Sequence, residues 1–354
     1  MSNKFSEKIL LCAYKDWANL GFTLASALRG IGLNAEMVKM HPHMNAYMEE
    51  GAVLTEKQIY NKIKHASIVH FMHSLGYPTG VRWRRWNSKG RNISLEDAFK
   101  KDESIPVKAW RMGLLEGKKV VMFHGGTEYR QHHDYVNFVA NKFVDRSIVQ
   151  TYDLLDLGAK NESWVLAPVN VGLLPKFDLQ SKKSIVFAHY PSNPIVKNSN
   201  MINGVMERCE KEVLSDAGFK RSIFYKYSDK RESHYKNMLR VRTCDVYIDH
   251  QGFLQNGKKY GEFGIATLEA AALGKIVITC TRSKHRYEKE YGEFLPFISN
   301  SSDDLKQIIM SIMRMSEKEL IALKKDTYKW AKKNHSYKSI ANRLKKIYQE
   351  CLDE

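Results

Sequence analysis

The sequence predicts an α/β protein of two Rossmann-like domains, and three observations lead to this fold class. The chain has 354 residues, which is more than one ordinary hydrophobic core organises and suits two domains of roughly 150 residues each. Short apolar runs alternate with longer amphipathic stretches, as in parallel sheets covered by helices. The alternation occurs as two series, separated at 166–183 by a stretch with Pro168, Pro175 and a polar QSKK run, which we interpret as the linker between the domains.

Each series predicts a sheet of its own. The first has strands expected at Ile9–Tyr14, Ala35–Met40, Ile68–Met72, Lys119–Phe123 and Ser147–Thr151. The second has strands expected at Ser184–His189, Ile223–Tyr227, Val246–Asp249, Lys275–Thr279 and Leu295–Ile298. A helix is expected at Phe22–Ile31, where apolar residues recur at helical spacing and glycines mark its end. We therefore expect an N-terminal domain at 1–175 and a C-terminal domain at 183–315.

The last stretch, 316–354, is predicted to be helical and to pack back on the N-terminal domain. Ser316 is followed three residues later by Glu319, which is the pattern of a capping box at a helix start. Apolar residues recur between the many lysines, so we interpret the lysines as the outer face of packed helices and not as an arm that binds nucleic acid.

The composition is that of a globular protein from a reducing compartment. Hydrophobic residues make up 43% and charged residues 27%, so no large disordered tract is required. The five cysteines are odd in number, lie far apart and never form C-x-x-C, which argues against a disulfide framework and favours the cytosol. Lys15 and Asp16 interrupt the first apolar run, which therefore predicts a strand and not a signal peptide. No apolar run reaches the length of a membrane span.

The net charge of +17 is the one unusual feature of the composition. It favours an anionic partner, which could be the phosphates of a substrate, an acidic lipid leaflet or nucleic acid. Solvated lysine-rich helices explain the charge equally well, so the charge alone does not select a function.

The chemistry is expected at the segment that follows the predicted strand at Val246–Asp249. Gly264 precedes an alanine-rich helix that ends near Gly274, and the next strand follows directly. A loop that leads into a helix leaves unpaired N–H groups and the positive end of the helix dipole at one place, which suits a diphosphate. Glu269 lies in the first turns of this helix, where its carboxylate can reach a ribose diol. In open α/β sheets such ligands bind at the carboxyl ends of the strands.

The string GEFGIATLEAAALGKIVI, from Gly261 to Ile278, resembles the donor-binding segment of glycosyltransferase family 4. In that family a pattern E-G-F-G-x-x-x-x-E-A-x-A-x-G-x-P-V recurs. Six positions match in register, namely Phe263, Gly264, Glu269, Ala270, Ala272 and Gly274. Glu262 lies one residue after the position of the family's first glutamate, and Ile276 replaces the proline.

This resemblance implies the GT-B fold, in which two Rossmann-like domains face each other across a cleft and the second domain holds a nucleotide sugar. Glu269 would bind the ribose, and Glu262 is a candidate catalytic residue near the transferred sugar. The rest of the implied donor site consists of Phe263, Gly264, Ile265 and Ala266.

A second match lies at the start of the predicted C-terminal domain. The stretch IVFAHYPSNPIVKN, 185–198, resembles the opening strand and loop of the family's second domain, and it puts Lys197 where a lysine contacts the donor diphosphate. The arginine expected five residues earlier is Ser192, so the phosphate charge must be offset elsewhere, for which Arg282 and the backbone of the donor loop are candidates.

The predicted N-terminal domain carries weaker matches. VVMFHGGTEYR, 120–130, resembles a strand end that lines the family's cleft, which makes His124 a candidate catalytic residue and Gly125 and Gly126 candidate donor contacts. Gly21 lies where the family has a loop whose glycine lets the backbone approach the donor.

The run VRWRRWNSKGR, 81–91, combines two tryptophans with basic residues. Such a run can contact lipid headgroups or stack on a sugar ring, and it can equally be a packed pair of tryptophans with solvated arginines. We interpret it as an acceptor or membrane contact, formed by Trp83, Arg84, Arg85 and Trp86.

The resemblance implies a retaining hexosyltransferase that moves a sugar from a nucleotide sugar to a cell-surface glycan, a lipid-linked acceptor or a similar molecule. No metal and no other cofactor is expected, because the sequence has no D-x-D triplet. A cytoplasmic protein is expected, peripheral to the inner face of the membrane, with no nucleic acid partner. Two alternatives stay open, namely a basic protein that binds nucleic acid, and a GT-B nucleotide-sugar epimerase or phosphorylase.

Overall fold

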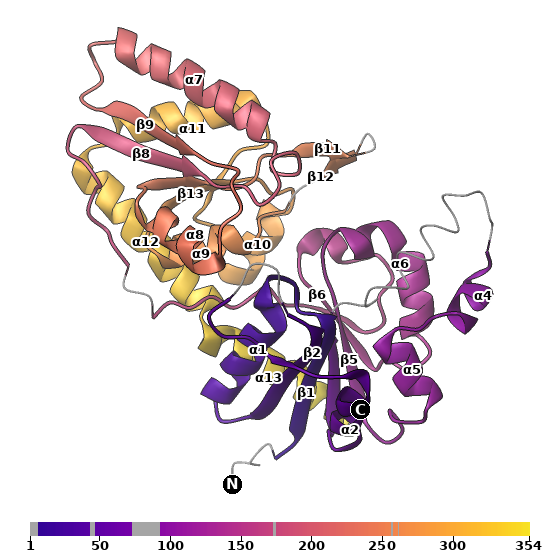
Figure 1. Cartoon of the computed structure of the whole chain (residues 1–354). Coiled ribbons are helices and arrows are strands. Elements are labelled where there is room, and N and C mark those ends of the chain that lie inside the picture. The colour runs from indigo at the N-terminus through magenta and orange to yellow at the C-terminus, as the bar shows by residue number, and fades with distance from the viewer. Residues whose placement is uncertain (1–5, 43–46, 73–92, 173–174, 256–257, 261) are drawn as a thin grey trace. The chain divides into compact units, whose positions relative to one another are not determined.

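The computed structural model describes residues 6–42, 47–72, 93–172, 175–255, 258–260 and 262–354, and it divides the chain into two compact units (Figure 1). Unit 1 consists of Met1–Pro168 and Tyr337–Glu354, and unit 2 consists of Val169–Ser336. The chain thus leaves unit 1 once and returns to it with its last helix. Each unit is described by itself below.

Unit 1 is built on a parallel sheet in the order β3-β2-β1-β4-β5-β6-β7. Its strands are β1 (Lys8–Lys15), β2 (Asn34–His41), β3 (Ala52–Val53), β4 (Ile68–Met72), β5 (Lys119–His124), β6 (Arg146–Val149) and β7 (Glu162–Trp164). Its helices are α1 (Leu20–Gly30), α2 (Glu56–Lys64), α4 (Leu95–Lys100), α5 (Ile105–Arg111), α6 (Gly126–Ala140) and α13 (Tyr337–Asp353), with short 3-10 turns η1 (Trp17–Asn19) and η2 (Tyr152–Leu154).

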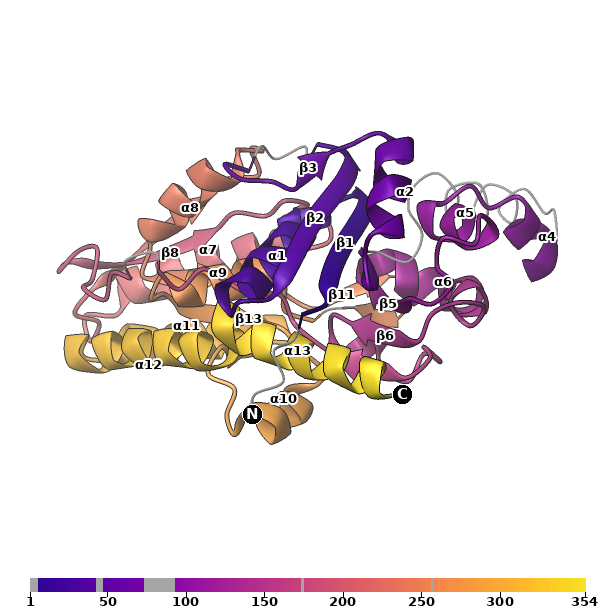
Figure 2. The same cartoon turned by 90° about the horizontal axis from the view of Figure 1, so that it is seen from below.

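The central strands of unit 1 are apolar on both faces because helices cover both sides of the sheet. All five residues of β4 are buried, as expected of a strand inside a parallel sheet. The last helix, α13, runs beside α1 (Figure 2), and it buries an apolar stripe that includes Ile340, Leu344 and Tyr348. The hydroxyl of Tyr348 lies 2.7 Å from Nδ1 of the buried His70 on β4, so the last helix is bonded to the centre of the first sheet.

Unit 2 is built on a second parallel sheet, in the order β14-β13-β10-β8-β9, and a two-stranded antiparallel ribbon, β11-β12. Its strands are β8 (Ser184–His189), β9 (Ser222–Tyr227), β10 (Val246–Ile248), β11 (Phe253–Gln255), β12 (Lys258–Tyr260), β13 (Ile276–Thr279) and β14 (Phe297–Ile298). Its helices are α7 (Ser199–Ser215), α8 (His234–Arg242), α9 (Ile265–Ala272), α10 (Lys284–Tyr291), α11 (Ser302–Arg314) and α12 (Glu317–His335).

The two predicted sheets are confirmed, and each predicted strand corresponds to a strand of the structure with ends that differ by up to two residues. The sequence analysis missed β3, β7 and the β11-β12 ribbon. These strands have two or three residues each, and β3 and β7 lie at the sheet edges, where one neighbouring strand is enough. Such short segments show no apolar run and are therefore invisible to patterns of hydrophobicity.

The predicted helix at Phe22–Ile31 is confirmed as α1, which begins two residues earlier. Its end has the hydrogen bonds of a Schellman motif, in which N–H of Leu33 donates to the carbonyl of Leu28 and N–H of Gly32 donates to that of Arg29. Gly32 adopts φ +84°, a left-handed conformation that glycine reaches without strain.

The C-terminal stretch is divided between the units. Ser316 and Glu319 form the predicted capping box at the start of α12, and this helix belongs to unit 2, whereas α13 belongs to unit 1. The first part of the stretch interpreted as a linker ends unit 1 at Pro168, and the rest packs on unit 2, where Phe177 lies against Gly274 and N–H of Gln180 donates to Asp245.

The start of α1 is held by a buried carboxylate. The two oxygens of Asp16 accept hydrogen bonds from N–H of Gly21 at 2.7 Å and from N–H of Phe22 at 2.9 Å. Asp16 is fully buried, and burial raises the pKa of its carboxyl to about 6 although these bonds act in the opposite direction. Asp16 therefore serves as the acceptor that the first turn of a helix requires.

We predict that Asp16 makes unit 1 less stable as the pH rises from 5 to 7.5. The pKa of Asp16 is about 6 in the folded state and 3.8 in the unfolded chain. Protonation of Asp16 therefore stabilises the folded state fully below pH 3.8, and this stabilisation is lost as the pH rises through 6. Between pH 5 and 7.5 the loss in unfolding free energy is on the order of 1 kcal/mol. Urea unfolding of wild type and Asp16→Asn measures it, because the amide cannot titrate.

The exposed Asp134 of α6 provides the control. Asp134→Asn should retain the pH slope of the wild type, whereas Asp16→Asn should flatten it. An equal slope in all three proteins contradicts the prediction.

Candidate functional site

At the carboxyl edge of the sheet in unit 2, a carboxylate, an ammonium group and the start of a helix lie together. The carboxylate belongs to Asp249, the residue after β10. Oδ1 of its buried carboxylate lies 2.6 Å from Nζ of Lys197, and Oδ2 accepts a hydrogen bond from Oγ1 of Thr267 at 2.7 Å. Burial alone would raise the pKa of Asp249, but the charge and hydrogen bond of Lys197 outweigh it and lower this pKa to about 2. Asp249 is therefore ionised at neutral pH, and Lys197 is its counter-ion.

Lys197 lies in the loop between β8 and α7, and this loop is bonded to the loop after β10. N–H of Gln251 donates to the carbonyl of Lys197 at 3.4 Å, and Nδ2 of Asn198 donates to the carbonyl of Gly252 at 3.1 Å. Asn198 adopts φ +57°, a left-handed conformation that asparagine tolerates better than most residues. The position of the ammonium is thus determined by both loops as well as by Asp249.

The helix α9 begins beside the ammonium of Lys197. Gly264 is its N-cap, and a Cβ atom at this residue would lie 3.6 Å from Nζ of Lys197. Glycine has no side chain that can accept from the first turn, and N–H of Thr267 donates to the carbonyl of Gly264 at 3.1 Å. The N–H groups of Ile265 and Ala266 are therefore the ones that a ligand or solvent can meet. The predicted residues Gly264, Ile265 and Ala266 thus form the start of α9, where Gly264 lies beside Lys197 and its N–H also donates to Oδ2 of Asp249 at 3.5 Å. A cation and a helix N-terminus lie together here, an arrangement that favours an anionic ligand.

Glu269 lies on the partly exposed face of α9, one turn after Ile265. Its Oε1 is 2.6 Å from Nε2 of His234, the first residue of α8, and the helices α8 and α9 pack side by side (Figure 1). Burial acts to lower the pKa of His234, but the hydrogen bond and charge of Glu269 outweigh it and raise this pKa. The predicted ribose ligand is thus on the same helix as the diphosphate candidates and is already paired with a histidine.

The side chains of Glu262 and Phe263 point into the protein. The carboxylate of Glu262, only 7% exposed, accepts hydrogen bonds from Oγ1 of Thr281 and from the hydroxyl of Tyr287. Phe263 is fully buried, with its ring 4.7 Å from that of Tyr287 and 5.1 Å from that of Phe294. Both residues support the turn that leads into α9, and the catalytic role of Glu262 stays a prediction.

The candidates of unit 1 lie at the carboxyl ends of its strands. His124 ends β5, is fully buried and stacks on Tyr129 with ring centroids 4.4 Å apart. Gly125 is the N-cap of α6, and Gly126 adopts φ +70°, where a residue with a side chain would be strained. These three residues thus lie at the end of β5 and the start of α6, and their function stays a prediction.

Gly21 lies in the first turn of α1 and not in a loop. A Cβ atom at this residue would come within 2.6 Å of Sδ of Met37, and its N–H group already donates to Asp16. A side chain at this position would therefore force the end of the Met37 side chain on β2 to move, so the packing of α1 on β2 favours glycine here. The acceptor or membrane candidates Trp83, Arg84, Arg85 and Trp86 lie outside the residues that the structure describes.

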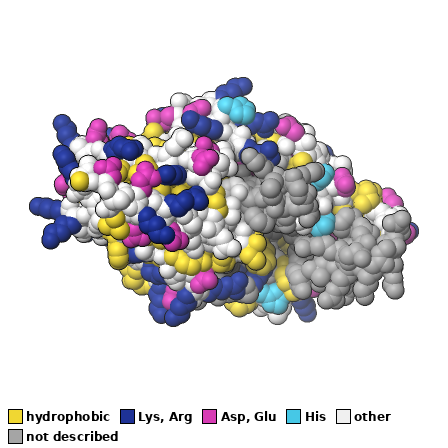
Figure 3. Space-filling model, turned by 90° about the horizontal axis from the view of Figure 1, so that it is seen from above, with side chains coloured by type: hydrophobic (Ala, Val, Ile, Leu, Met, Phe, Trp, Pro, Cys, Tyr) yellow, Lys and Arg dark blue, Asp and Glu magenta, His cyan; other side chains and the backbone are white. Residues whose placement is uncertain are grey.

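Neither a cluster of metal ligands nor a membrane-spanning helix is found in the part of the chain that the structure describes, and the face in Figure 3 shows no continuous basic surface. No group of three or more His, Cys, Asp or Glu side chains among them could hold a metal ion. No helix in the described part of the chain is long and apolar enough to cross a membrane. On the face that Figure 3 shows, Lys and Arg side chains are interspersed with Asp and Glu side chains and do not merge into one basic field.

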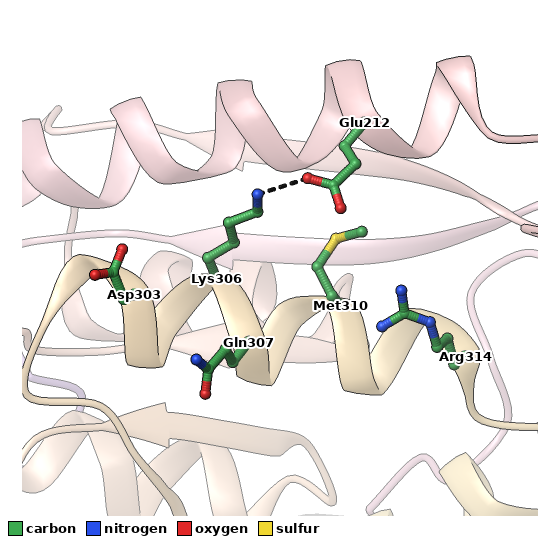
Figure 4. A pocket seen from close by; sticks show the side chains of 6 residues that line it. All are labelled: Glu212, Asp303, Lys306, Gln307, Met310 and Arg314. Carbon is green, nitrogen blue, oxygen red and sulfur yellow. Dashed lines mark ion pairs between the residues drawn. The ribbon is translucent and has the colours of Figure 1, made fainter.

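A surface groove in unit 2 lies away from Asp249, between α7 and α11 (Figure 4). Lys306 of α11 and Glu212 of α7 form an ion pair of 2.6 Å across it. The other lining residues also come from α11, namely Asp303, Gln307, Met310 and Arg314. The ion pair joins the two helices across the groove, which we interpret as ordinary helix packing.

Comparisons with known proteins identify the fold. The chain matches no protein-family model and no curated protein sequence. Among solved structures it is similar to HepE from Anabaena in complex with UDP-glucose, with a TM-score of 0.62, 11% sequence identity, and coverage of 97% of this chain and 100% of that one. The chain has the GT-B fold.

Two further structures agree with this assignment. The sucrose-phosphate synthase from Thermosynechococcus elongatus matches with a TM-score of 0.58 and 11% identity, over 98% of this chain and 99% of that one. TarM from S. aureus, solved with fondaparinux, α-GlcNAc-glycerol and UDP, matches with a TM-score of 0.60 and 9% identity, over 97% and 99%. The GT-B fold expected from the resemblance is therefore confirmed at sequence identities too low to transfer function.

Three residues of this GT-B chain were missed by the sequence analysis, namely Asp249, Thr267 and His234. Asp249 had a signal, because it is an acidic residue at the carboxyl end of a buried strand. His234 and Thr267 had none, because a histidine at a helix start and a threonine inside a helix are common. Only the folded chain shows that both meet the carboxylates of the candidate site.

We predict that Asp249→Asn destabilises unit 2 by about 2 kcal/mol at pH 7, because Lys197 then lacks its buried counter-ion. The pKa of about 2 in the folded state lies below the ordinary 3.8, so the stabilisation is present above pH 3.8 and is lost as the pH falls through 2. Urea unfolding at pH 7 and at pH 3 measures the difference, which should be smaller at the lower pH.

Asp303 of α11 is exposed and serves as the matched control in the same unit. Asp303→Asn should lower the unfolding free energy by less than about 1 kcal/mol, because its exposed carboxylate interacts, among the described residues, only with the dipole at the start of α11. Equal losses in the two variants at pH 7 contradict the role assigned to the Asp249–Lys197 pair.

Proposed function

We propose that this chain is a hexosyltransferase that takes its sugar from a nucleotide sugar bound to unit 2. One observation carries the proposal, namely that Lys197, the N-terminus of α9 and Glu269 lie along one edge of unit 2 in a protein with the GT-B fold. Solved structures of the same fold include HepE with UDP-glucose and TarM with UDP, which supports UDP as the first nucleotide to test.

The donor diphosphate is proposed to bind at the start of α9. An ammonium group has three donors, and Asp249 uses one of those of Lys197, so the others are left for phosphate oxygens. The N–H groups of Ile265 and Ala266 would add hydrogen bonds, and the helix dipole would stabilise the negative charge. Glu269, one turn further along α9, would accept hydrogen bonds from the ribose hydroxyls.

The transfer is proposed to be metal-independent and to retain the configuration of the anomeric carbon. The acceptor oxygen would bond to the anomeric carbon on the face from which the diphosphate leaves, and the electron pair of the broken C–O bond would stay with the diphosphate. The acceptor proton would pass to a phosphate oxygen. Lys197 and the N-terminus of α9 would stabilise the leaving group by preorganised electrostatics. His124 and Glu262 are the candidates for groups near the reacting carbon.

The acceptor is proposed to be a cell-surface glycan or a lipid-linked sugar, with the protein cytoplasmic and peripheral at an anionic membrane face. The net charge of +17 supports an anionic partner. TarM, solved with the glycan-like ligands fondaparinux and α-GlcNAc-glycerol, supports a glycan acceptor.

We predict that the full chain binds at least one of UDP, GDP and ADP and hydrolyses or transfers from the corresponding sugar nucleotide. Calorimetry measures binding, and mass spectrometry of a panel of UDP-, GDP- and ADP-sugars measures turnover without added metal and with excess chelator. Absence of binding and of turnover with every member contradicts the proposal. Interconversion of the donor sugar without an acceptor would indicate an epimerase, and a requirement for inorganic phosphate would indicate a phosphorylase. Tight, salt-dependent binding of nucleic acid without any of these activities would indicate a nucleic-acid-binding protein.

We predict that Glu269→Ala weakens nucleotide binding by on the order of tenfold or more, because the ribose hydroxyls lose a charged acceptor. The carboxylate is partly exposed, so the thermal unfolding curve should retain its cooperativity. Glu207→Ala on α7 removes an exposed carboxylate that pairs with Lys211 and should leave binding unchanged. An affinity equal to that of wild type removes Glu269 from the site.

A further inference from the structure

The helix α8 directs a histidine towards the proposed donor site. Met238 and Val241 form its buried stripe, and His234 lies one turn before Met238 on the same side. Oγ of Ser233 accepts a hydrogen bond from N–H of Lys236 and so determines where the helix begins. The first position of a stripe that is otherwise apolar is thus occupied by an imidazole, and that imidazole meets Glu269 of α9.

The contact between the two side chains is short and partly shielded from water. Nε2 of His234 lies 2.6 Å from Oε1 of Glu269, and the side chains are 30% and 23% exposed. Burial acts to lower the pKa of His234, and the hydrogen bond and charge of Glu269 raise it, so the contact favours the protonated ring beside the carboxylate. Exposed ion pairs, in contrast, are held loosely and contribute little.

A glutamate that recognises a diol has to present its oxygens in one orientation. A free glutamate side chain samples several rotamers, and ordering it in one of them costs conformational entropy. The bond from His234 to Oε1 removes much of that freedom before a ligand arrives. A carboxylate has about four acceptor positions, so Oε2 and the second lone pair of Oε1 can still accept from a ligand, and the side chain is 23% exposed.

We propose that His234 is a positioning residue, which holds the carboxylate of Glu269 in the orientation that recognises the ribose hydroxyls of the donor nucleotide. The inference rests on the proposed function and adds the source of ribose selectivity to it. Without His234, Glu269 rotates freely, and the advantage of a ribonucleotide over its deoxy counterpart disappears. The diphosphate contacts proposed for Lys197 lie at the start of α9, one turn before Glu269, and do not involve His234, so they are expected to stay unchanged.

The test measures the affinity of the full chain for UDP and 2′-deoxy-UDP by calorimetry, with GDP, ADP and their 2′-deoxy forms as further probes. Wild type should prefer the ribonucleotide by on the order of tenfold, the value of one hydrogen bond to a charged group. His234→Ala should lose about that factor for the ribonucleotide and less than about twofold for the deoxynucleotide. In turnover, KM for the sugar nucleotide should rise with kcat nearly unchanged.

Two variants separate positioning from general structural support. In His234→Gln the amide nitrogen can still donate to Glu269, so the preference for ribose should return at least in part. Tyr235 is the next residue on α8 and is half exposed, so Tyr235→Ala should behave as wild type. Thermal unfolding of each variant shows whether unit 2 stays folded.

The outcomes distinguish the two proposals. If wild type binds none of UDP, GDP and ADP, the proposed function fails and the positioning role fails with it. If wild type binds a nucleotide but does not prefer ribose, or if His234→Ala keeps the preference, only the role of His234 is overturned. Equal weakening of both nucleotides in His234→Ala also overturns it, because such a loss indicates structural support alone.

Discussion

The buried ion pair between Asp249 and Lys197 is the interaction on which the candidate site depends. A buried carboxylate is tolerated only when its charge is matched and its oxygens are bonded, and Asp249 meets both conditions through Lys197 and Thr267. These two partners come from different segments, the loop after β8 and the helix α9. The carboxylate of Asp249 therefore holds the loop between β8 and α7 against the start of α9.

The composition of α9 explains why its N-terminus and Glu269 are both accessible at the carboxyl edge of the sheet in unit 2. Leu268, Ala270 and Ala271 are buried, and their modest size lets the helix pack closely on unit 2. At its end Gly274 adopts φ +71° against Phe177, where a side chain would clash. The opposite face is left with Ile265, Ala266 and Glu269, so the groups suited to a diphosphate and to a ribose lie on one side.

Sequence patterns predicted the fold well because both sheets consist of buried parallel strands with continuous apolar runs. They also located the segment from Gly264 to Glu269, since glycine before an alanine-rich helix is a local pattern. The sequence pattern could not tell which residues of this segment point into the protein and which point to solvent. Phe263 and Glu262 belong to the matching string, yet the structure turns both side chains into the protein, towards Tyr287. Neighbouring residues of an irregular turn have no fixed periodicity from which their direction could be predicted.

The sequence by itself determined the two α/β units, the capping box at Ser316 and the helix that carries Glu269, because these depend on local propensity and on the periodicity of apolar residues. Only the tertiary structure decided that the last helix, α13, belongs to unit 1, and that Asp249 pairs with Lys197 and His234 with Glu269. These pairs join residues 35 and 52 positions apart. Contacts of this kind arise from the packing of separate strands and helices, which one sequence does not encode in any local pattern.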